Sequence, residues 1–205
     1  MLTVAIQAGG DSLRMGQDKA LIPFLGEPLI QRVVERVTIL ADEILVTTNK
    51  PEAYGFLQVP LVADVIPGTG ALGGLYTALH AASHPLVAVV ACDMPFVNPQ
   101  ILSAARRLLE ETGADVAIAR TEAGFEPFHA VYRREACLAA VGLALAAGER
   151  RLISWFPAVQ VALLSPEIIT RYDPQGLAFW NLNTPQELAQ AEVLARSNEF
   201  VPPEP

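Results

Sequence analysis

A glycine-rich loop near the start of the chain combines residue types that suit the binding of a phosphate. Residues 7–19 read Gln-Ala-Gly-Gly-Asp-Ser-Leu-Arg-Met-Gly-Gln-Asp-Lys and follow the apolar, β-branched run 2–6. Adjacent glycines allow backbone N–H groups to approach a phosphate closely, because no Cβ stands in the way. Arg14 and Lys19 add positive charge that binds an anion. The loop is therefore the first candidate site, the alternative being an ordinary strand-to-helix loop with solvated charges.

The carboxylate of Asp93 is the second candidate. It follows residues 86–91, an almost wholly apolar run of the kind that forms a central strand covered on both faces. A carboxylate at the end of such a strand is costly to desolvate unless a cation pairs with it. Mg²⁺ held partly by substrate phosphates is a suitable partner, which predicts that Asp93 binds metal. The alternatives are that Asp93 caps the next helix or pairs with a lysine.

Two further polar clusters come directly after predicted strands. The run 43–48 ends in a Thr-Thr-Asn cluster that begins at Thr47, and Asp64 follows the run 59–63. Ligands bind at the carboxyl ends of the strands in open α/β sheets, so all four clusters are expected at one site. Asp64 either contacts a ribose hydroxyl or a water beside the ligand, or only fixes its own loop.

Apolar periodicity predicts the elements that must position these residues. Strands are predicted over residues 2–6, 43–48, 59–63, 86–91, 115–119, 128–132 and 158–164, with a late edge strand over 179–182. Helices are predicted over 28–40, from the glycine-rich stretch 67–74 to about 82, over 99–112 and over 134–147. A last helix is capped by Thr184, with Pro185 at its first position and Glu187 three residues after the cap. This alternation favours an α/β fold in three layers, with a doubly wound, mostly parallel sheet.

Length and composition limit the class of protein. The 205 residues suit one domain over 1–198 with a frayed tail over 199–205, and 52% hydrophobic residues suffice for a large core. The 14 basic and 22 acidic residues give a net charge of −8, which argues against general binding to nucleic acid or to an anionic membrane. Cys92 and Cys137 are predicted to be reduced thiols, and no targeting or membrane-spanning run is present, so we expect a cytoplasmic protein.

Two familiar phosphate-binding motifs do not fit the first loop. A P-loop requires Gly-Lys-Ser/Thr after its spacer, whereas Lys19 is preceded by Asp18 and followed by Ala20. A dinucleotide-binding fold requires G-x-G-x-x-G, whereas the glycines here are adjacent. An NAD-dependent oxidoreductase is therefore not expected.

The motifs together resemble those of the nucleotidyltransferases and, more narrowly, of the molybdenum cofactor guanylyltransferase family. The resemblance extends to about residue 197 and rests on Gln7-Ala8-Gly9-Gly10, Arg14-Met15-Gly16, Asp18-Lys19, Cys92-Asp93-Met94-Pro95, Gly148-Glu149-Arg150-Arg151 and Asn181-Leu182-Asn183-Thr184-Pro185. It implies a Rossmann-like nucleotidyltransferase fold and the transfer of GMP from GTP to molybdopterin, with release of pyrophosphate. It also implies Mg²⁺ as cofactor, and proteins that deliver the molybdenum cofactor as further partners.

The resemblance also implies roles for individual residues. The nucleotide would be bound by Gln7, Ala8, Gly9, Gly10, Lys19, Thr47, Asp64 and Asp93, with Arg14, Lys19 and Asp93 as catalytic residues and Asp93 as the Mg²⁺ ligand. The second substrate would lie near Arg150, Arg151, Asn181 and Asn183. Two positions depart from the family pattern: Gln7 stands where leucine is more usual, and Thr47 where asparagine is expected.

Other readings stay open at this point. Cytidylyl transfer to molybdopterin, nucleotidyl transfer to a sugar phosphate and a non-catalytic nucleotide-binding protein all fit the same loop. His80 and His84 have helical i, i+4 spacing but lack the glutamate of a zinc protease, which favours surface histidines. His129 either faces the second substrate or is structural, and Trp155 and Trp180 either stack on a pterin or pack in the core.

Overall fold

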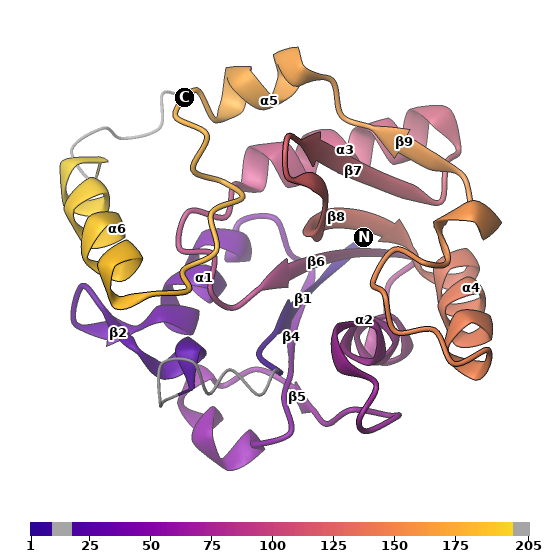
Figure 1. Cartoon of the computed structure of the whole chain (residues 1–205), viewed down its shortest axis with the longest axis horizontal. Coiled ribbons are helices and arrows are strands. Elements are labelled where there is room, and N and C mark those ends of the chain that lie inside the picture. Colours follow the sequence, from indigo (N-terminus) through magenta and orange to yellow (C-terminus); the bar gives the residue numbers. More distant parts are fainter. Residues whose placement is uncertain (10–17, 199–205) are drawn as a thin grey trace.

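A seven-stranded mixed sheet forms the centre of the computed structural model, which describes residues 1–9 and 18–198 (Figure 1). The strand order is β5 (Leu61–Val62), β4 (Glu43–Thr47), β1 (Leu2–Gln7), β6 (Leu86–Ala91), β8 (Gly124–Arg133), β7 (Val116–Thr121) and β9 (Val161–Leu163). Neighbours from β5 to β6 are parallel, and so are β7 and β9, whereas β8 is antiparallel to both of its neighbours. The predicted class, an α/β fold with a mostly parallel sheet, is confirmed.

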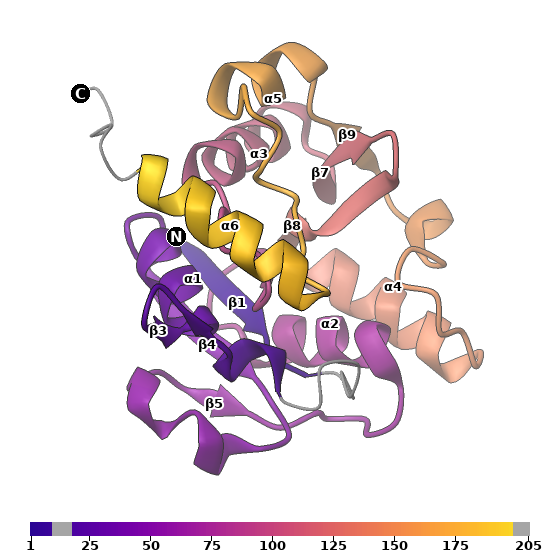
Figure 2. The ribbon, with the colours of Figure 1, turned by 60° about the vertical axis from the view of Figure 1, so that its left-hand side comes forward.

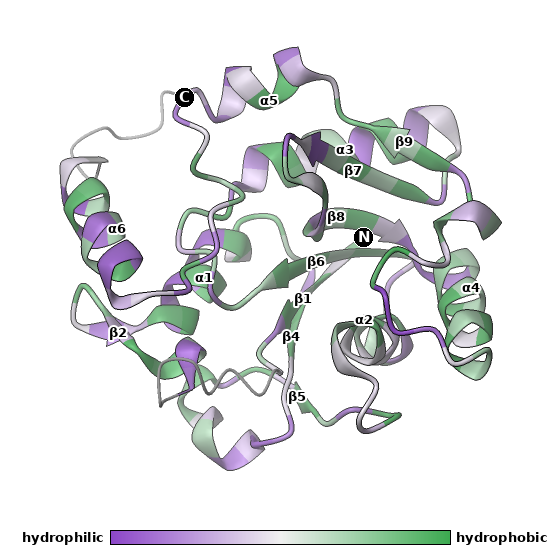
Figure 3. Ribbon diagram, in the orientation of Figure 1, coloured by the Kyte–Doolittle hydropathy of each residue, from purple (hydrophilic) through white to green (hydrophobic). Residues whose placement is uncertain are grey.

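Helices cover both faces of the sheet. In Figure 1, α1 (Leu29–Thr38), α3 (Pro99–Thr112) and α5 (Pro166–Tyr172) lie on one side, and α2 (Gly70–Ala81) and α4 (Arg134–Ala146) on the other. The two cores follow from the alternation of side chains along a strand. On β1, Val4 and Ile6 pack into the core on the α1 face, and Ala5 packs into the core on the α2 face. Figure 3 shows apolar residues along the central strands and a mixture of apolar and polar residues on helices such as α5 and α6 (Pro185–Asn198).

The order of the strands creates the crevice that the site requires. From β1 the chain crosses to β4 and β5 on one side, and then returns to place β6 on the other side of β1. The connections therefore diverge between β1 and β6, and a crevice opens at the carboxyl ends of these two strands. Gln7 ends β1 and Ala91 ends β6, and the two residues are directly paired in the sheet.

The last helix closes the molecule over one end of this crevice. Helix α6 (Pro185–Asn198) begins at the predicted cap and packs beside α1 and the hairpin of β2 (Pro23–Phe24) and β3 (Glu27–Pro28), as Figure 2 shows. A small apolar cluster joins these elements and contains Phe24, Leu29, Phe96, Leu182, Ala191 and Ala195. Within the described residues, no helix is long and apolar enough to cross a membrane.

The prediction of a late edge strand over residues 179–182 is wrong. The backbone N–H groups of this segment form hydrogen bonds within a turn and with Asp93, and they do not pair with a neighbouring strand. The N–H of Trp180 donates to Leu177 O at 3.0 Å, and the N–H of Leu182 donates to Asp93 O at 3.0 Å. The predictions over 59–63 and 158–164 were too long, and the β2–β3 hairpin and α5 were not predicted.

The cap of α3 allows a test of local stability. Asn98 accepts hydrogen bonds from the N–H groups of Gln100 (2.9 Å) and Ile101 (3.2 Å), and its side-chain amide donates to Tyr172 O (2.9 Å). We expect Asn98→Ala to lower the free energy of unfolding by about 1–2 kcal/mol, measured by urea denaturation. Ser165→Ala removes a single, longer cap bond of 3.4 Å to Ile168 on the shorter helix α5 and should cost less. Equal losses in the two variants would contradict this ranking.

Candidate functional site

A cavity of about 420 Å³ lies at the carboxyl ends of β1 and β6. Most of the sequence-predicted residues that the structure describes line it, together with residues that were not predicted. The lining consists of Gln7, Ala8, Gly9, Asp18, Lys19, Ala71, Ala91, Cys92, Asp93, Phe128, Asn181 and Asn183. A larger cavity of about 590 Å³ lies beside Arg32 and Arg36 of α1 and contains none of the predicted site residues. The cavity at the strand ends is therefore the candidate site.

A cation, a carboxylate and an amide meet in this cavity. Lys19 Nζ donates to Asn183 Oδ1 at 2.7 Å and lies 3.6 Å from Asp93 Oδ2. The Lys19 and Asp93 side chains are only 12% and 16% exposed. Burial raises the pKa of the Asp93 carboxyl, and the positive charge of Lys19 opposes this effect without cancelling it. Asp93 therefore faces a lysine, which is one of the alternatives considered from the sequence, and its binding of a metal stays a prediction.

The amide of Asn183 is held by the start of α6. Its backbone N–H and that of Thr184 donate to Glu187 Oε2 at 2.6 and 2.9 Å, while the N–H of Glu187 donates to Thr184 Oγ1 at 3.1 Å. This is the predicted capping box, and the N–H of Asn183 is the main reason why the pKa of Glu187 is lowered. The side-chain amide of Asn183 donates in turn to Asn181 O at 2.9 Å. The chain before α6 therefore enters the cavity in a fixed conformation.

Gln7 brings an unusual polar group to the end of β1. Its side chain is only 6% exposed and lies against α2, where a Cβ on Gly74 would stand 2.7 Å from Gln7 Oε1. The amide nitrogen Nε2 is buried and has no hydrogen-bond partner among the described residues. Gly74 thus leaves room for Gln7 in its observed position, and a larger residue there would require the glutamine side chain to shift.

The comparisons with known proteins show to which family the chain belongs. Residues 4–161 match the model of the MobA-like NTP transferase domain. The chain belongs to this family. It is 36% identical over 197 residues to a probable molybdenum cofactor guanylyltransferase of Pelotomaculum thermopropionicum, covering 96% of this chain and 94% of the relative. It is 38% identical to the probable molybdenum cofactor guanylyltransferase of Chloroflexus aggregans, covering 92% of each.

Solved structures show the same fold. The crystal structure of molybdopterin-guanine dinucleotide biosynthesis protein A from Archaeoglobus fulgidus superposes with a TM-score of 0.82 at 26% identity, over 95% of this chain and 99% of that one. A 2-C-methyl-D-erythritol 4-phosphate cytidylyltransferase from Thermus thermophilus has a TM-score of 0.65 at 20% identity, over 94% of this chain and 98% of that one. The second likeness concerns the fold alone.

Several predicted residues of this MobA-like chain lie outside the cavity. Thr47 is 2% exposed and is paired with Gln7 in the sheet, so its side chain does not line the site. Asp64 binds Asn49 twice: Asn49 Nδ2 donates to Asp64 Oδ2 at 2.8 Å, and the N–H of Asp64 donates to Asn49 Oδ1 at 3.0 Å. These bonds fix the loop between β5 and α2, which is the second of the two roles considered for Asp64.

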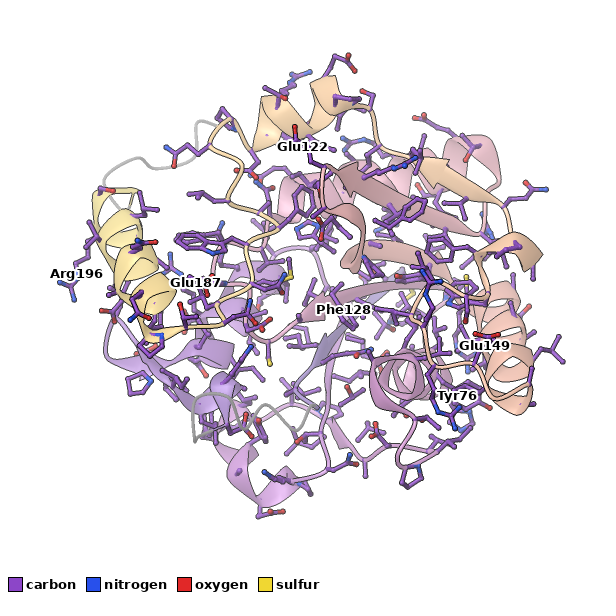
Figure 4. All side chains as sticks on the ribbon, viewed as in Figure 1. Tyr76, Glu122, Phe128, Glu149, Glu187 and Arg196 are labelled. Carbon is purple, nitrogen blue, oxygen red and sulfur yellow. The ribbon has the colours of Figure 1, made fainter. Side chains whose placement is uncertain are left out.

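The two arginines after α4 are also separate from the cavity. Arg150 and Arg151 are exposed, and Arg150 Nη1 donates to its neighbour Glu149 O at 2.9 Å. In Figure 4, Glu149 lies beside the end of α4 and Glu187 at the start of α6, with Phe128 between them. The predicted Gly10 and Arg14 fall outside the described residues.

The aromatic and histidine residues have structural environments. Trp155 is 2% exposed in the core, and Trp180 stacks on Phe96 with ring centroids 6.1 Å apart. His80 is exposed and stacks on Tyr76, and among the described residues no three His, Cys, Asp or Glu side chains form a metal cluster. Both Cys92 and Cys137 are free thiols, as predicted. The two tryptophans, His80 and Cys137 therefore do not extend the candidate site, whereas Cys92 is one of the residues that line it.

His129 supports the start of α3. It is fully buried, its Nε2 accepts the N–H of Asn98 at 3.0 Å, and its ring packs edge-to-face on Phe179 at 5.0 Å. It does not line the cavity, which favours the structural alternative. Burial lowers the pKa of His129 from 6.5 to about 4, so the imidazole is neutral at pH 7.

Five residues of the lining were not predicted as site residues, and two of them, Asp18 and Phe128, have side chains that matter for the argument. In the sequence, Asp18 is only part of the motif with Lys19, whereas in the structure it is one of the residues that line the cavity. Phe128 was noted only as part of a strand, and no spacing pattern connects it with residues 7–19. Its position depends on the antiparallel pairing of β8 with β6, which local periodicity does not encode.

The buried imidazole of His129 should make the free energy of unfolding depend on pH. Because the folded pKa of about 4 lies below the ordinary 6.5, the unfolded chain takes up the proton first as the pH falls. The free energy of unfolding should fall between pH 6.5 and 4 by up to roughly 3 kcal/mol from this group, and the loss should level off at lower pH. Urea denaturation at several pH values measures it.

Two variants isolate the contribution of this residue. His129→Gln removes the titrating group and should flatten the pH dependence relative to the wild-type protein. His80→Gln removes an exposed histidine and should leave the dependence unchanged. A slope that survives in His129→Gln would contradict the assignment.

Proposed function

We propose that the protein transfers GMP from GTP to molybdopterin, yielding the guanine dinucleotide cofactor and pyrophosphate. The observation that carries the proposal is the meeting of Lys19, Asp93 and Asn183 in one cavity between β1 and β6. The chain belongs to a nucleotidyltransferase family, and relatives that it covers almost completely are named molybdenum cofactor guanylyltransferases. The printed name of the Archaeoglobus structure, at 26% identity, also refers to molybdopterin-guanine dinucleotide synthesis.

In this proposal the nucleotide occupies the β1 side of the cavity. Gln7, Ala8 and Gly9 line that side and would contact the base and ribose, with Gly10 continuing the same loop. Lys19 would bind the phosphates, aided by Arg14. Thr47 and Asp64 would then act from behind the site, because they hold β4 and the loop before α2 in place.

The acceptor would lie on the opposite side. Asn181 and Asn183 line the cavity there and are held by α6, so they offer fixed polar groups to a pterin phosphate. Arg150 and Arg151 are exposed and would contact the acceptor only outside the cavity. Proteins that deliver the molybdenum cofactor would approach from this side.

The reaction needs little proton chemistry. A phosphate oxygen of molybdopterin, already anionic at neutral pH, forms a bond to the α-phosphorus of GTP while the bond to the bridging oxygen of pyrophosphate breaks. No general base is required, and the main obstacle is repulsion between two anions. Lys19 offsets this repulsion with a buried ammonium group and stabilises charge on the leaving pyrophosphate. Asn183 orients Lys19 through their 2.7 Å hydrogen bond.

The donor set suits Mg²⁺. Asp93 is a mostly buried carboxylate whose pKa is raised by burial, so a further cation would relieve it. Mg²⁺ is commonly held by one or two carboxylates together with substrate phosphates, which matches a site with Asp93 and no larger cluster among the described residues. When bound, the ion would neutralise charge on the phosphates.

Pyrophosphate release tests the proposal. We expect release with GTP, Mg²⁺ and molybdopterin together, and none when molybdopterin or the metal is left out. GTP, CTP and ATP are compared, with sugar phosphates as replacement acceptors. Preference for CTP would assign a cytidylyltransferase, and release only with a sugar phosphate would reassign the acceptor. Nucleotide binding without any release would support a non-catalytic protein instead.

The role of Asp93 is tested by Asp93→Asn, which keeps the shape of the side chain and removes its charge. Turnover should fall by roughly 10²-fold or more, because the metal and the phosphates lose their anchor. The melting temperature should fall only slightly, because Lys19 loses its ion-pair partner but keeps its hydrogen bond to Asn183. Asp115→Asn changes a carboxylate that binds Gln160 away from the cavity and should keep full turnover. Normal turnover in Asp93→Asn would refute the metal assignment.

A further inference from the structure

The cavity contains a second carboxylate that needs an explanation. Asp18 lines it beside Lys19, and Lys19 is the only cation among the described lining residues. A carboxylate next to a phosphate site is unfavourable for two reasons. It repels the phosphates, and it can neutralise the neighbouring ammonium group by pairing with it. The negative charge of Asp93 can be compensated by Lys19 and a metal, but the negative charge of Asp18 has to be stabilised by other groups.

Tyr54, from a distant part of the chain, stabilises the carboxylate of Asp18 with a hydrogen bond. Its hydroxyl donates to Asp18 Oδ2 at 2.7 Å, across 36 positions of sequence, and the N–H of Ala20 donates to Asp18 Oδ1 at 3.2 Å. Each oxygen of Asp18 therefore has a protein donor. The contacts of Lys19 go instead to Asn183 at 2.7 Å and to Asp93 at 3.6 Å.

The surroundings of Tyr54 make its hydroxyl a dependable donor. The residue is fully buried in the core on the α1 face, at the junction of two short 3-10 turns, Pro51–Ala53 and Gly55–Leu57, between β4 and β5. Its N–H donates to Pro51 O at 3.1 Å, which fixes the backbone. Burial, and next the hydrogen bond to Asp18, raise the pKa of this hydroxyl far above its ordinary value, so it stays protonated.

We propose that Tyr54 is a positioning residue that holds Asp18 away from Lys19 and so leaves the Lys19 ammonium free to bind phosphate. The inference rests on the proposed function to the extent that Lys19 is the phosphate ligand. Asp18 also caps the turn Lys19–Leu21 through Ala20. Without the hydroxyl, Asp18 Oδ2 loses its donor, and the competing partner is the ammonium group of Lys19, the only cation among the described residues that line the cavity.

Tyr54→Phe tests this directly, because it removes the hydroxyl and keeps the ring. Calorimetric titration is done without Mg²⁺, with inorganic pyrophosphate, GTP and guanosine as probes. Pyrophosphate and GTP should bind roughly tenfold more weakly, in line with the loss of one hydrogen bond to a charged group. The affinity for guanosine should not change. A merely structural role would weaken all three ligands together and lower the melting temperature in parallel.

The matched control is Tyr132→Phe. Tyr132 is also fully buried, and its hydroxyl donates to a backbone carbonyl, Pro127 O, at 2.6 Å. This variant therefore loses a buried tyrosine hydrogen bond without affecting Asp18, and its pyrophosphate affinity should equal that of the wild-type protein. Comparable loss of pyrophosphate binding in Tyr132→Phe and Tyr54→Phe would overturn the proposal.

A double-mutant cycle with Asp18→Asn identifies the charge as the cause. The neutral amide at position 18 cannot neutralise Lys19, so adding Tyr54→Phe to Asp18→Asn should not weaken pyrophosphate binding further. The same tenfold loss in the Asp18→Asn background would overturn the mechanism. If the wild-type protein bound neither pyrophosphate nor GTP, with or without Mg²⁺, the proposed function would fail and this inference with it. Equal binding by wild type and Tyr54→Phe would overturn the inference alone.

Discussion

The desolvation of Asp93 is the constraint on which the rest of the site depends. The carboxylate stands at the end of β6, a strand that is buried along its whole length, and it is only 16% exposed. A charge in this position is unfavourable without a cation nearby. Lys19 supplies part of the compensation from the loop after β1, and the fold brings it there because β1 and β6 are paired directly at the point where the strand order reverses.

The C-terminal segment is bound to the same group from the other side. The N–H of Leu182 donates to the carbonyl oxygen of Asp93, and Asn183 accepts a hydrogen bond from Lys19 across 164 positions of sequence. The capping box of α6 sets the conformation of this segment, and apolar contacts of Leu182 and Ala191 hold the helix against α1. The lining of the cavity thus combines residues between positions 7 and 128 with the segment before α6, and the family match over residues 4–161 covers only the former.

Local patterns in the sequence predicted what depends on near neighbours. The apolar runs of β1 and β6, the capping box at Thr184 and the position of Asp93 at a strand end were all recovered, because each follows from residues within a few positions. The predictions failed, or were not made, where a structure depends on contacts between residues far apart in the sequence. The segment 179–182 has strand-like composition but binds Asp93, and the hydroxyl of Tyr54 reaches Asp18 through the packing of a turn that carries no motif. Nothing in the spacing of residues 18 and 54 indicates that contact.

The excess of acidic residues in the chain means that negative charges near this cavity must be compensated. With a net charge of −8, the protein has no excess of cations to surround a polyphosphate, so each carboxylate near the site must be matched by a specific donor. Three solutions occur within a short distance in the fold. Asp93 faces the ammonium group of Lys19, Asp18 accepts a neutral hydroxyl, and Glu187 accepts backbone N–H groups. Only the first uses a cation. Because the other two carboxylates are satisfied by uncharged donors, Asp93 is the only one of the three that draws on the ammonium group described in the cavity. An acidic protein can therefore keep a local cation in a cavity without having a basic surface.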